Sequence, residues 1–481
     1  MPGDVRIVDP EWPPRRPGPP ARSPSSAQDE APPRPPPPES EEPAPVQSLG
    51  PARFKTSKRN KRGDVIESLS YKLLGQATME AGHVRVGTDR RLWTYAGGVY
   101  QPEGDDFVER FVCEAMDDDF RSTQIEEVKR WLRAHEPTIT DEQPRHLLNV
   151  RNGLLDWRTG KLRPHTPDEP STIQLPVTFD PEATCPEVEE FLRQAMPEDA
   201  YEFALEVIAY VLWPEGNPFR KAVQLLGPTG TGKSVFLNLL TALVGDDNCS
   251  AVPLQTLAED RFAAADLYGK LANISGDLDA RQVQRSDVFK MMTGGDVIRA
   301  DIKFGQPFKF RWPGVAVFSA NEAPRTRDQS DAWLGRWLIL PMVNQVPERA
   351  QDRGLTDRLT QPSELSGLLN LALDSMHHLE RSRSFTEPAS VREAKEQYSR
   401  DVNTVAAWCE ECVELDPDST VSRREVRTSY ERWCEDEGRP PLAAGRQYER
   451  ILAKYGEQVT EFKTNGSRGF KGLRVTLPPS I

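Results

Sequence analysis

The chain has 481 residues, a formal net charge of −13 and a hydrophobic content of 37%, enough for two or three domains with buried cores. No stretch is as long and apolar as a membrane-spanning helix, and the first residues lack the apolar run of a secretory signal. We therefore expect a soluble, cytoplasmic protein without a membrane partner. The acidic balance excludes a simple nucleic-acid coat protein, so any contact with DNA has to be local.

The N-terminal segment, residues 1–60, is expected to be a disordered tail. Of the 43 prolines, 17 lie within residues 2–51, and a segment of this composition cannot form a packed core. The tail ends in a basic run, RFKTSKRNKR at residues 53–62, which holds six Lys or Arg and no acid. The run is either a DNA tether or a solvated linker, and its position beside a disordered segment favours the linker.

Residues 61–195 are predicted to form a domain of mixed helix and strand. The stretch QIEEVKRWLRAH has the periodicity of an amphipathic helix, and NVRNGLLDWRTGKLRPHTP is typical of two strands joined at Thr159-Gly160. Three consecutive acids, Asp117–Asp119, belong either to a two-metal site for nucleotidyl transfer or to an exposed helix end. The exposed helix end is favoured because one uninterrupted run cannot place all three carboxylates on a metal pair.

Residues 196–375 alternate apolar strands with amphipathic helices, which predicts an α/β domain built on a parallel sheet. Within this domain, GPTGTGKS at residues 227–234 fits the phosphate-binding pattern G-x-x-x-x-G-K-[ST]. The apolar run AVQLL enters the loop as a strand, and SVFLNLLTALVG leaves it as a helix. This flanking structure argues against the alternative, an ordinary glycine-rich turn.

The loop predicts a site for ATP and Mg²⁺. Its glycines allow backbone N–H groups to converge on phosphate oxygens, and the helix N-terminus adds partial positive charge. Lys233 is expected to reach the β- and γ-phosphates, and the Ser234 hydroxyl is expected to bind Mg²⁺. The predicted nucleotide-binding residues are Gly227, Pro228, Thr229, Gly230, Thr231, Gly232, Lys233 and Ser234.

Two later strand ends supply the other polar groups that such a site needs. LANISGD ends at Asp277, which we predict to be a catalytic carboxylate and Mg²⁺ ligand, with Asp279 as the alternative. VAVFSAN ends at Asn321, whose amide is placed to hydrogen-bond the γ-phosphate and the attacking water. A lone Asn after a strand is usually a turn former. A catalytic role is favoured here only because the glycine-rich loop, the acid and the amide follow one another in this order along the chain.

Residues 391–481 are predicted to form a separate winged-helix domain. VSRREVRTSYERWCEDEG and GRQYERILAKYG have helical periodicity, and the strands QVTEFKT and FKGLRVTL flank the turn dipeptide Asn465-Gly466. From residue 421 onward the chain carries twelve Lys or Arg against eight Asp or Glu, a local positive charge that would suit DNA. Winged-helix domains also serve as protein contacts, so the domain could bind either DNA or another protein. Cys409 and Cys412 lie i, i+3 on an expected helix, where packing is favoured over zinc binding.

With these motifs in place, residues 149–342 resemble the superfamily 3 helicases of phage and plasmid primase–helicase proteins, which are related to the poxvirus-type enzymes. The phosphate-binding loop alone is common, whereas the ordered set of family-like stretches is specific. The C-terminal winged segment resembles the family more weakly. The stretches are NVRNGLLDW, PHTP, LPVTFDPEATCPEVEEFL, GPTGTGKS, GKLANISGDL, FKMMTGGDVIRADIK and FSANEAPRTRDQSDAWLGRW.

The resemblance implies an AAA+ type P-loop ATPase core that works as a ring, expected to be a hexamer, with ATP sites between subunits. Lys233 and Ser234 match the family's first motif, Asp277 its acidic motif and Asn321 its sensor. Arg336 in LGRW matches the arginine finger that reaches a neighbouring subunit's γ-phosphate.

The resemblance also implies a DNA contact in the ring. Lys303 matches a lysine that the family places on a hairpin lining the central channel, where a point charge grips DNA phosphates. Lys309 either assists it or is an ordinary lysine at a sheet edge. A positive channel would reconcile DNA binding with the acidic net charge.

Residues 61–195 resemble the family's helicase-associated N-terminal domain. Many relatives carry a primase domain ahead of the helicase, and the tail and the mixed region leave no room for one. We therefore expect no primer synthesis by this chain alone, and the sequence leaves open whether a separate primase or polymerase is a partner.

Three functions remain open from the sequence. The first is an ATP-driven replicative DNA helicase, encoded by a phage or mobile element, that acts in a bacterial host and, like its relatives, moves 3′ to 5′ on single strands. The second is a primase–helicase with a cryptic site at Asp117–Asp119. The third is a nucleotide-dependent origin-binding or loading ATPase that does not unwind DNA.

Overall fold

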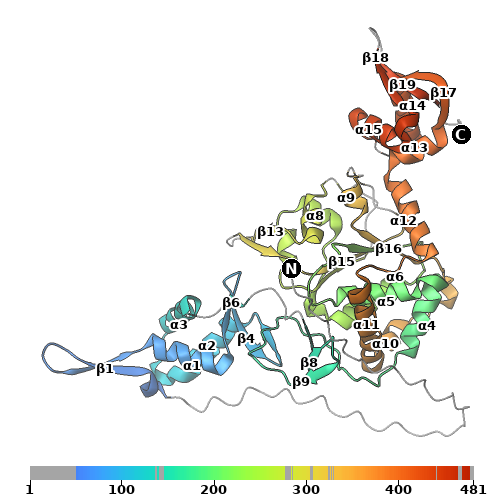
Figure 1. Cartoon of the computed structure of the whole chain (residues 1–481). Helices are drawn as coiled ribbons and strands as arrows, with labels where there is room; N and C mark the ends of the chain where they lie inside the picture. Colours follow the sequence, from blue (N-terminus) through green and yellow to red (C-terminus); the bar gives the residue numbers. More distant parts are fainter. Residues whose placement is uncertain are drawn as a thin grey trace, which may run out of the picture. The chain divides into compact units, whose positions relative to one another are not determined.

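The computed structural model describes residues 50–135, 138–139, 146–276, 283, 285–303, 307–322, 326, 328, 330–439, 441–463 and 468–476. The chain divides into two compact units, Met1–Phe179 and Asp180–Ile481 (Figure 1). The predicted tail up to residue 49 lies outside the described residues. Among the described helices, none is long and apolar enough to cross a membrane.

Three helices form the core of the first unit: α1 (Tyr71–Gly82), α2 (Gly104–Met116) and α3 (Ser122–His135). Helix α3 contains the amphipathic stretch predicted from the sequence, with Val128 and Leu132 buried. Gly75 of α1 faces the Trp131 ring of α3, where an added Cβ would lie 2.3 Å from a ring carbon. Glycine at this position therefore permits the close approach of the two helices.

Two small sheets accompany these helices. The first has the order β5-β4-β3-β6, and the second is an antiparallel meander of β7, β8 and β9 in which the predicted Thr159-Gly160 turn joins β8 to β9. Asn149 and His165, from two of the family-like stretches, are 3.1 Å apart between Oδ1 and Nε2. The bounds are β3 (Arg85–Gly87), β4 (Leu92–Ala96), β5 (Val99–Gln101), β6 (Thr138–Ile139), β7 (Leu147–Val150), β8 (Gly153–Asp156) and β9 (Lys161–Arg163).

The basic run near the N-terminus is folded, in contrast to the linker that we expected. A short 3-10 helix, η1 (Pro51–Phe54), is followed by the antiparallel hairpin of β1 (Lys55–Arg59) and β2 (Val65–Leu69). Phe54 is buried in the helical core of the unit, which anchors the start of the run. The boundary expected at residue 60 therefore falls inside a hairpin, and the interpretation of the run as a solvated linker is wrong.

The second unit contains a five-stranded parallel sheet, as predicted for residues 196–375. Its strand order is β11-β12-β15-β10-β16, so the strand that leads into the glycine-rich loop lies in the interior. Because the strands are parallel, the loops that follow their carboxyl ends meet at one edge of the sheet. The strands are β10 (Ala222–Leu226), β11 (Cys249–Ser250), β12 (Ala272–Ser275), β15 (Val315–Ala320) and β16 (Trp337–Pro341).

Helices of the second unit pack against this sheet and against one another. The Val188 N–H at the start of α4 donates a 3.1 Å hydrogen bond to Glu364 of α11, so α4 belongs to this unit. The domain boundary expected at residue 195 is therefore placed too late. The helices are α4 (Pro186–Ala195), η3 (Glu198–Ala200), α5 (Tyr201–Val211), α6 (Lys233–Val244), η4 (Asp246–Asn248), α7 (Leu254–Glu259), η5 (Ala263–Leu267), η6 (Glu348–Ala350), α10 (Leu355–Leu359) and α11 (Pro362–Ser382).

A hairpin and two helices lie between β12 and β16, together with strand β15 of the sheet. Strands β13 (Val297–Ala300) and β14 (Phe308–Arg311) pair antiparallel, after α8 (Asp287–Gly294). Helix α9 (Asp331–Leu334) precedes β16. Aromatic rings connect these parts, with Phe289 of α8 stacked on Trp337 of β16 at a centroid distance of 4.7 Å and Trp333 of α9 beside it.

The C-terminal lobe follows α12 (Ala389–Val402). Both predicted helices and the hairpin are present, and the sheet order is β17-β19-β18. The turn dipeptide at 465–466 lies outside the described residues, but the strands on either side of it pair. The elements are α13 (Thr404–Cys412), β17 (Val413–Ser422), α14 (Arg423–Asp436), α15 (Ala444–Tyr455), η7 (Gly456–Gln458), β18 (Thr460–Lys463) and β19 (Arg468–Val475).

The close cysteine pair lies inside this lobe. Cys409 and Cys412 are both buried in its hydrophobic core. Burial raises the pKa of the Cys409 thiol to about 12 and that of Cys412 to about 11. Both side chains therefore pack as neutral thiols.

Candidate nucleotide-binding site

The glycine-rich loop between β10 and α6 forms a backbone cradle. Gly230 and Gly232 have φ values of +83° and +88°, which glycine adopts without strain. Gly227 lies against the chain after β16, where an added Cβ would be 1.8 Å from the Met342 carbonyl oxygen. Helix α6 begins at Lys233, so the N–H groups of its first turn face the loop. This arrangement fits a phosphate group.

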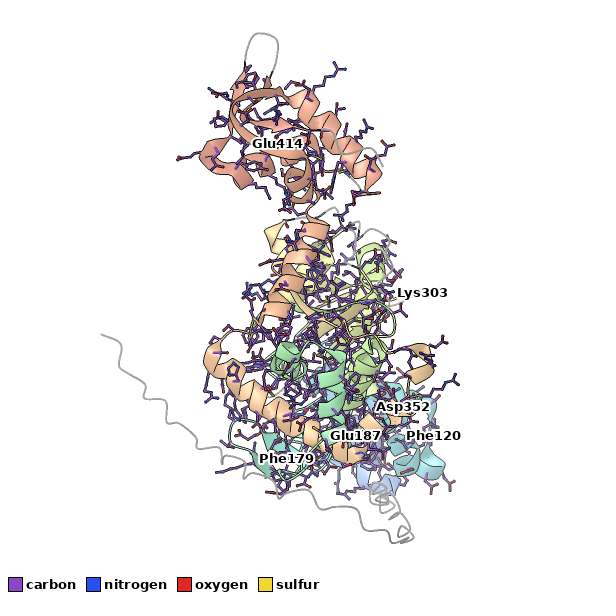
Figure 2. The ribbon with its side chains drawn as sticks, turned by 90° about the vertical axis from the view of Figure 1, so that its right-hand side faces the viewer. Phe120, Phe179, Glu187, Lys303, Asp352 and Glu414 are labelled. Carbon is purple, nitrogen blue, oxygen red and sulfur yellow. The ribbon has the colours of Figure 1, made fainter. Side chains whose placement is uncertain are left out.

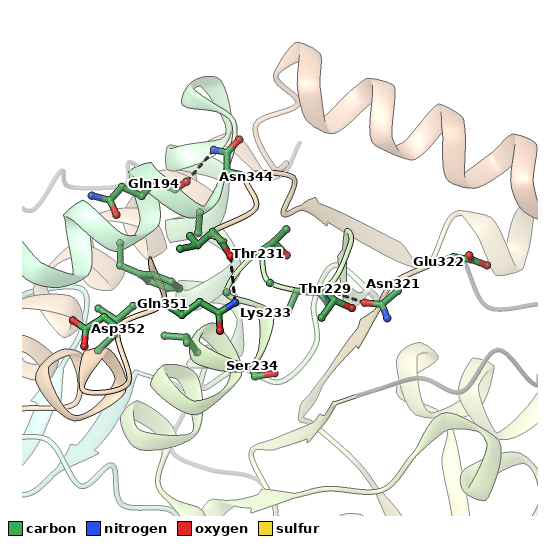
Figure 3. A pocket seen from close by; sticks show the side chains of 17 residues that line it. Gln194, Thr229, Thr231, Lys233, Ser234, Asn321, Glu322, Asn344, Gln351 and Asp352 are labelled. Atoms are coloured by element: carbon green, nitrogen blue, oxygen red, sulfur yellow. Dashed lines mark hydrogen bonds between the residues drawn. The ribbon is translucent and has the colours of Figure 1, made fainter. Parts of the chain in front are cut away.

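Lys233 and Asn321, which are 88 residues apart in the sequence, meet at this loop. Lys233 Nζ donates hydrogen bonds to the carbonyl oxygens of Gly227 and Pro228, both at 2.7 Å, and to Asn321 Oδ1 at 3.0 Å (Figure 3). The strand register explains the meeting, because Ala320 pairs with Leu226 and both strands end there. The lysine side chain is almost fully buried, so its ammonium is already oriented toward the cradle.

A cavity of about 810 Å³ opens beside the loop. Phe191 and Ala195 of α4 and Leu355 of α10 line its apolar side, whereas Asn321 and Glu322 lie at the opposite side in Figure 3. The predicted residues Thr229, Gly230, Thr231, Gly232, Lys233 and Ser234 line it as well. An apolar wall next to a phosphate cradle suits a ligand that joins a flat ring to an anion, as a nucleotide does.

The segment after β16 ties the loop to α4. Asn344 Nδ2 donates to the carbonyl oxygens of Gln194 and Met196, both at 2.9 Å, and the Val346 N–H donates to the Gly230 carbonyl at 2.9 Å. These contacts fix the apolar wall beside the cradle. Sequence reasoning missed this wall because α4 precedes the sheet and only tertiary packing brings it to the loop.

An acidic side chain stands at the rim of the cavity. Arg358 donates to Asp352 at 2.6 Å and to Glu187 of α4 at 3.2 Å, and Figure 2 labels both acids. The hydrogen bond from Arg358 lowers the pKa of Asp352. Asp352 is therefore held ionised at the rim, on the side of the apolar wall.

The predicted carboxylates Asp277 and Asp279 lie outside the described residues. The strand that leads to them is described: β12 ends at Ser275, which pairs with Phe318 of β15. The chain therefore leaves β12 at the same edge of the sheet as the glycine-rich loop and Asn321.

Arg336 lies at the opposite end of the sheet from the cradle. The residue that follows it, Trp337, pairs with Ala222, the first residue of β10. The length of β10 separates Arg336 from the loop, roughly 17 Å at the rise of a strand. Its side chain is half-buried, and Nε has no hydrogen-bond partner among the described residues. Arg336 is thus too far away to act on the cradle of its own chain.

The predicted DNA-binding lysines lie on the β13–β14 hairpin. Lys303 is exposed in the connection between the two strands (Figure 2), and Lys309 is exposed on β14, opposite Arg299 of β13. Arg299 also pairs with Asp301 at 3.1 Å, so the hairpin carries charges of both signs.

An ion pair connects the elements around this hairpin. Lys290 of α8 pairs with Asp328, which lies between β15 and α9 and also accepts hydrogen bonds from Ser286 and Ser330. Burial alone would raise the pKa of Asp328, but the hydrogen bonds from Lys290, Ser286 and Ser330 outweigh it and lower the pKa to about 2. The pair links the helix before the hairpin to the segment between Asn321 and Arg336.

The acidic run Asp117–Asp119 forms a 3-10 turn, η2, at the end of α2. Its residues are exposed, as predicted for a helix end, and Asp119 pairs with Lys55 at 2.8 Å. In the part of the chain that the structure describes, no three His, Cys, Asp or Glu side chains cluster so as to hold a metal ion.

Comparisons with known proteins match both units. The family "D5 N terminal like" matches residues 114–197, and "Family of unknown function (DUF5906)" matches residues 225–336. The curated "Putative helicase L207/L206" of Acanthamoeba polyphaga mimivirus is 22% identical over 222 residues, which cover 44% of this chain and 23% of that protein. These matches support a phage or viral primase–helicase family member.

The solved structures that resemble the chain are only distantly similar to it. Two apo structures of the NrS-1 C terminal region cover 83% of this chain and 98% of theirs, at 11% and 12% identity and TM-scores of 0.47 and 0.49. The alignment with the mimivirus relative spans about a quarter of that protein. The family match and the curated relative support a helicase-related function in replication.

Proposed function

We propose that this protein is an ATP-dependent DNA helicase of phage-type replication, built on an AAA+ type core and a C-terminal winged helix. The observation that carries the proposal is the meeting of Lys233 Nζ with Asn321 Oδ1 at 3.0 Å above the glycine cradle. A lysine, an amide at a neighbouring strand end and a helix N-terminus form the set that nucleoside triphosphate hydrolysis needs. The strand order β11-β12-β15-β10-β16 supports the assignment.

Each residue has a distinct role in this proposal. Lys233 binds the β- and γ-phosphates of ATP, and the exposed Ser234 hydroxyl at the start of α6 joins Asp277 in holding Mg²⁺. The bound Mg²⁺ would neutralise charge on the phosphates. Asn321 orients the attacking water, and Phe191 packs on the base.

Arg336 acts in trans, from one subunit on the ATP of the next. Its place at the far end of the sheet excludes a role in its own cradle. Arg336 Nη1 donates to the Ala332 carbonyl oxygen, and the side chain is only half-buried, so the end of the guanidinium can reach a ligand on a neighbouring chain. A guanidinium from a neighbour couples hydrolysis to assembly, which favours a ring, proposed to be a hexamer. Lys303 and Lys309 are proposed to contact DNA in the channel of that ring.

The test is strand displacement on forked DNA with ATP and Mg²⁺, with 3′- and 5′-tailed substrates and Lys233→Ala as the control. Displacement that requires Lys233 supports the proposal, and the preferred tail gives the polarity. ATP hydrolysis without displacement on any fork contradicts it and favours an origin-loading ATPase.

A further inference from the structure

The β1–β2 hairpin of the first unit is a two-stranded ribbon with both faces exposed. It projects from the helices of its unit in Figure 1, and eight of its ten strand residues are exposed. Arg59 pairs with Val65 and Lys58 pairs with Ile66. Side chains opposite each other in an antiparallel pair share a face, and successive residues alternate faces. Each face near the tip therefore presents one cation beside one aliphatic side chain.

The tip concentrates positive charge in a protein of net charge −13. Lys58, Arg59, Lys61 and Arg62 are all exposed, and none of them has a charged partner within the described part of the chain. The one acid in the connection, Asp64, accepts a hydrogen bond from Asn60 Nδ2 at 3.0 Å. Four cations thus stand at the end of the ribbon, and none forms a salt bridge with a described residue.

The ribbon has a defined conformation. Asn60 Oδ1 accepts hydrogen bonds from the N–H groups of Arg62 and Asp64, at 2.8 and 3.0 Å, and Gly63 has a φ of +92°. At the base, Lys55 pairs with Asp119 at 2.8 Å, and this hydrogen bond lowers the pKa of the Asp119 carboxyl. The cations are therefore presented by a folded hairpin that is tied to the helical core.

We propose that the β1–β2 hairpin binds duplex DNA by inserting its tip into the major groove. Neighbouring strands lie about 4.8 Å apart, and the major groove, about 12 Å wide, admits a two-stranded ribbon. The cations on the two faces of the hairpin match the phosphates on the two walls of the groove. The alternative partner, a protein with a flat acidic surface, could contact the cations on only one face of the hairpin. Val65 and Ile66, 60% and 52% exposed, are placed for apolar contact with base edges.

The experiment measures binding of the full chain, without nucleotide, to labelled duplex DNA across a series of salt concentrations. The test variant is Lys58→Ala/Arg59→Ala/Lys61→Ala/Arg62→Ala. The matched control is Lys72→Ala/Arg110→Ala/Arg121→Ala/Lys161→Ala, which removes four exposed cations elsewhere in the same unit. Both variants have the same net charge, so a difference in their DNA affinity shows that the position of the removed cations matters. Circular dichroism and ATP hydrolysis without DNA verify that each remains folded.

We expect the test variant to bind duplex DNA at least about tenfold more weakly than the control. The slope of log affinity against log salt should fall by about 0.9 for each DNA phosphate that the variant no longer neutralises. Equal affinity of the two variants would overturn the proposal. Loss of single-strand binding with unchanged duplex binding would also overturn it, as would a change in oligomeric state alone. The proposal does not depend on the ATPase assignment, because Lys233→Ala is expected to bind this duplex like the unmodified chain.

Discussion

Lys233 is positioned before any nucleotide binds, because its ammonium already has three oxygen acceptors in the cradle. Phosphate oxygens can replace these acceptors without movement of the buried side chain. We predict that Lys233→Ala lowers the rate of ATP hydrolysis at least about a hundredfold, the usual cost of removing a preorganised charge-stabilising donor. Phosphate release at saturating ATP measures the effect.

Lys270→Ala is the matched control for that loss. Lys270 also donates to a backbone oxygen, that of Asp247, and it lies before β12, at the end of the sheet away from the loop. We expect this variant to hydrolyse ATP at the unmodified rate. Hydrolysis by Lys233→Ala at the control's rate would contradict the assignment of the site.

Arg336 makes a second prediction at the residue scale. Arg336→Ala should bind a fluorescent ATP analogue normally, because the cradle of the same subunit lies at the other end of β10. Its hydrolysis rate should fall by about 10³, the lower range for removal of an arginine finger. A mixture of Arg336→Ala and Lys233→Ala chains should recover activity, because some interfaces then combine both intact residues. No recovery on mixing, or weakened nucleotide binding, would contradict action in trans.

How far residue roles can be predicted depends on their distance along the chain from a recognisable motif. Lys233 sits in the loop motif itself, and Asn321 ends a mostly apolar strand that follows the loop and the acid in the expected order, so both were predicted and both line the cavity. Phe191 has no such signal, because its role depends on the packing of α4 against the loop. Asp328 was missed for the same reason: its partner Lys290 is separated from it by a hairpin and a strand.

At the scale of the elements, the Lys290–Asp328 ion pair joins α8 to the segment before α9, and its contribution to stability can be measured. The pKa of Asp328 is about 2 in the folded protein and about 3.9 when unfolded. Stability from this carboxylate is thus fully present above pH 4 and is lost as the pH falls from about 4 to about 2. We predict that Asp328→Asn lowers the free energy of unfolding by about 2 kcal/mol at pH 7.

Urea denaturation at pH 7 and at two or three lower pH values measures this effect. The difference between Asp328→Asn and the unmodified chain should shrink as the pH approaches 2. Asp266→Asn, at an exposed carboxylate of η5, is the control and should change stability little. A difference that stays constant between pH 4 and pH 2 would show that the carboxylate's charge does not carry the stabilisation.

The elements that the sequence predicted well are those whose burial dictates their composition. The strands of the parallel sheet are apolar because helices and neighbouring strands cover them, and the glycine-rich loop identifies the helix that follows. β17 was missed because VELDPDSTVS contains acids and a proline and only one of its ten residues is buried. The β1–β2 hairpin was missed for a similar reason, since its alternating faces are both solvent-exposed and give no apolar period.

At the scale of the whole molecule, the proposed helicase has to couple ATP hydrolysis to movement of DNA. The described structure offers one physical route: α8 leads into the β13–β14 hairpin, and Lys290 connects α8 to the segment that joins Asn321 to Arg336. A change at the nucleotide or at the subunit interface would reach Lys303 through these elements. The hairpin is therefore expected to move with the nucleotide state while the cradle keeps its own geometry.

This arrangement predicts that hydrolysis and unwinding can be separated. Lys303→Ala should keep most of its ATP hydrolysis, because the exposed hairpin is not among the elements that line the cavity, and should lose strand displacement to the level of Lys233→Ala. Lys303→Arg, which keeps the charge for phosphate contact, should retain most of the displacement. Normal unwinding by Lys303→Ala would contradict the proposal that the β13–β14 hairpin holds the DNA during unwinding. Loss of hydrolysis and unwinding together would instead show that the hairpin supports the ATPase fold, since a pure DNA contact leaves the cradle intact.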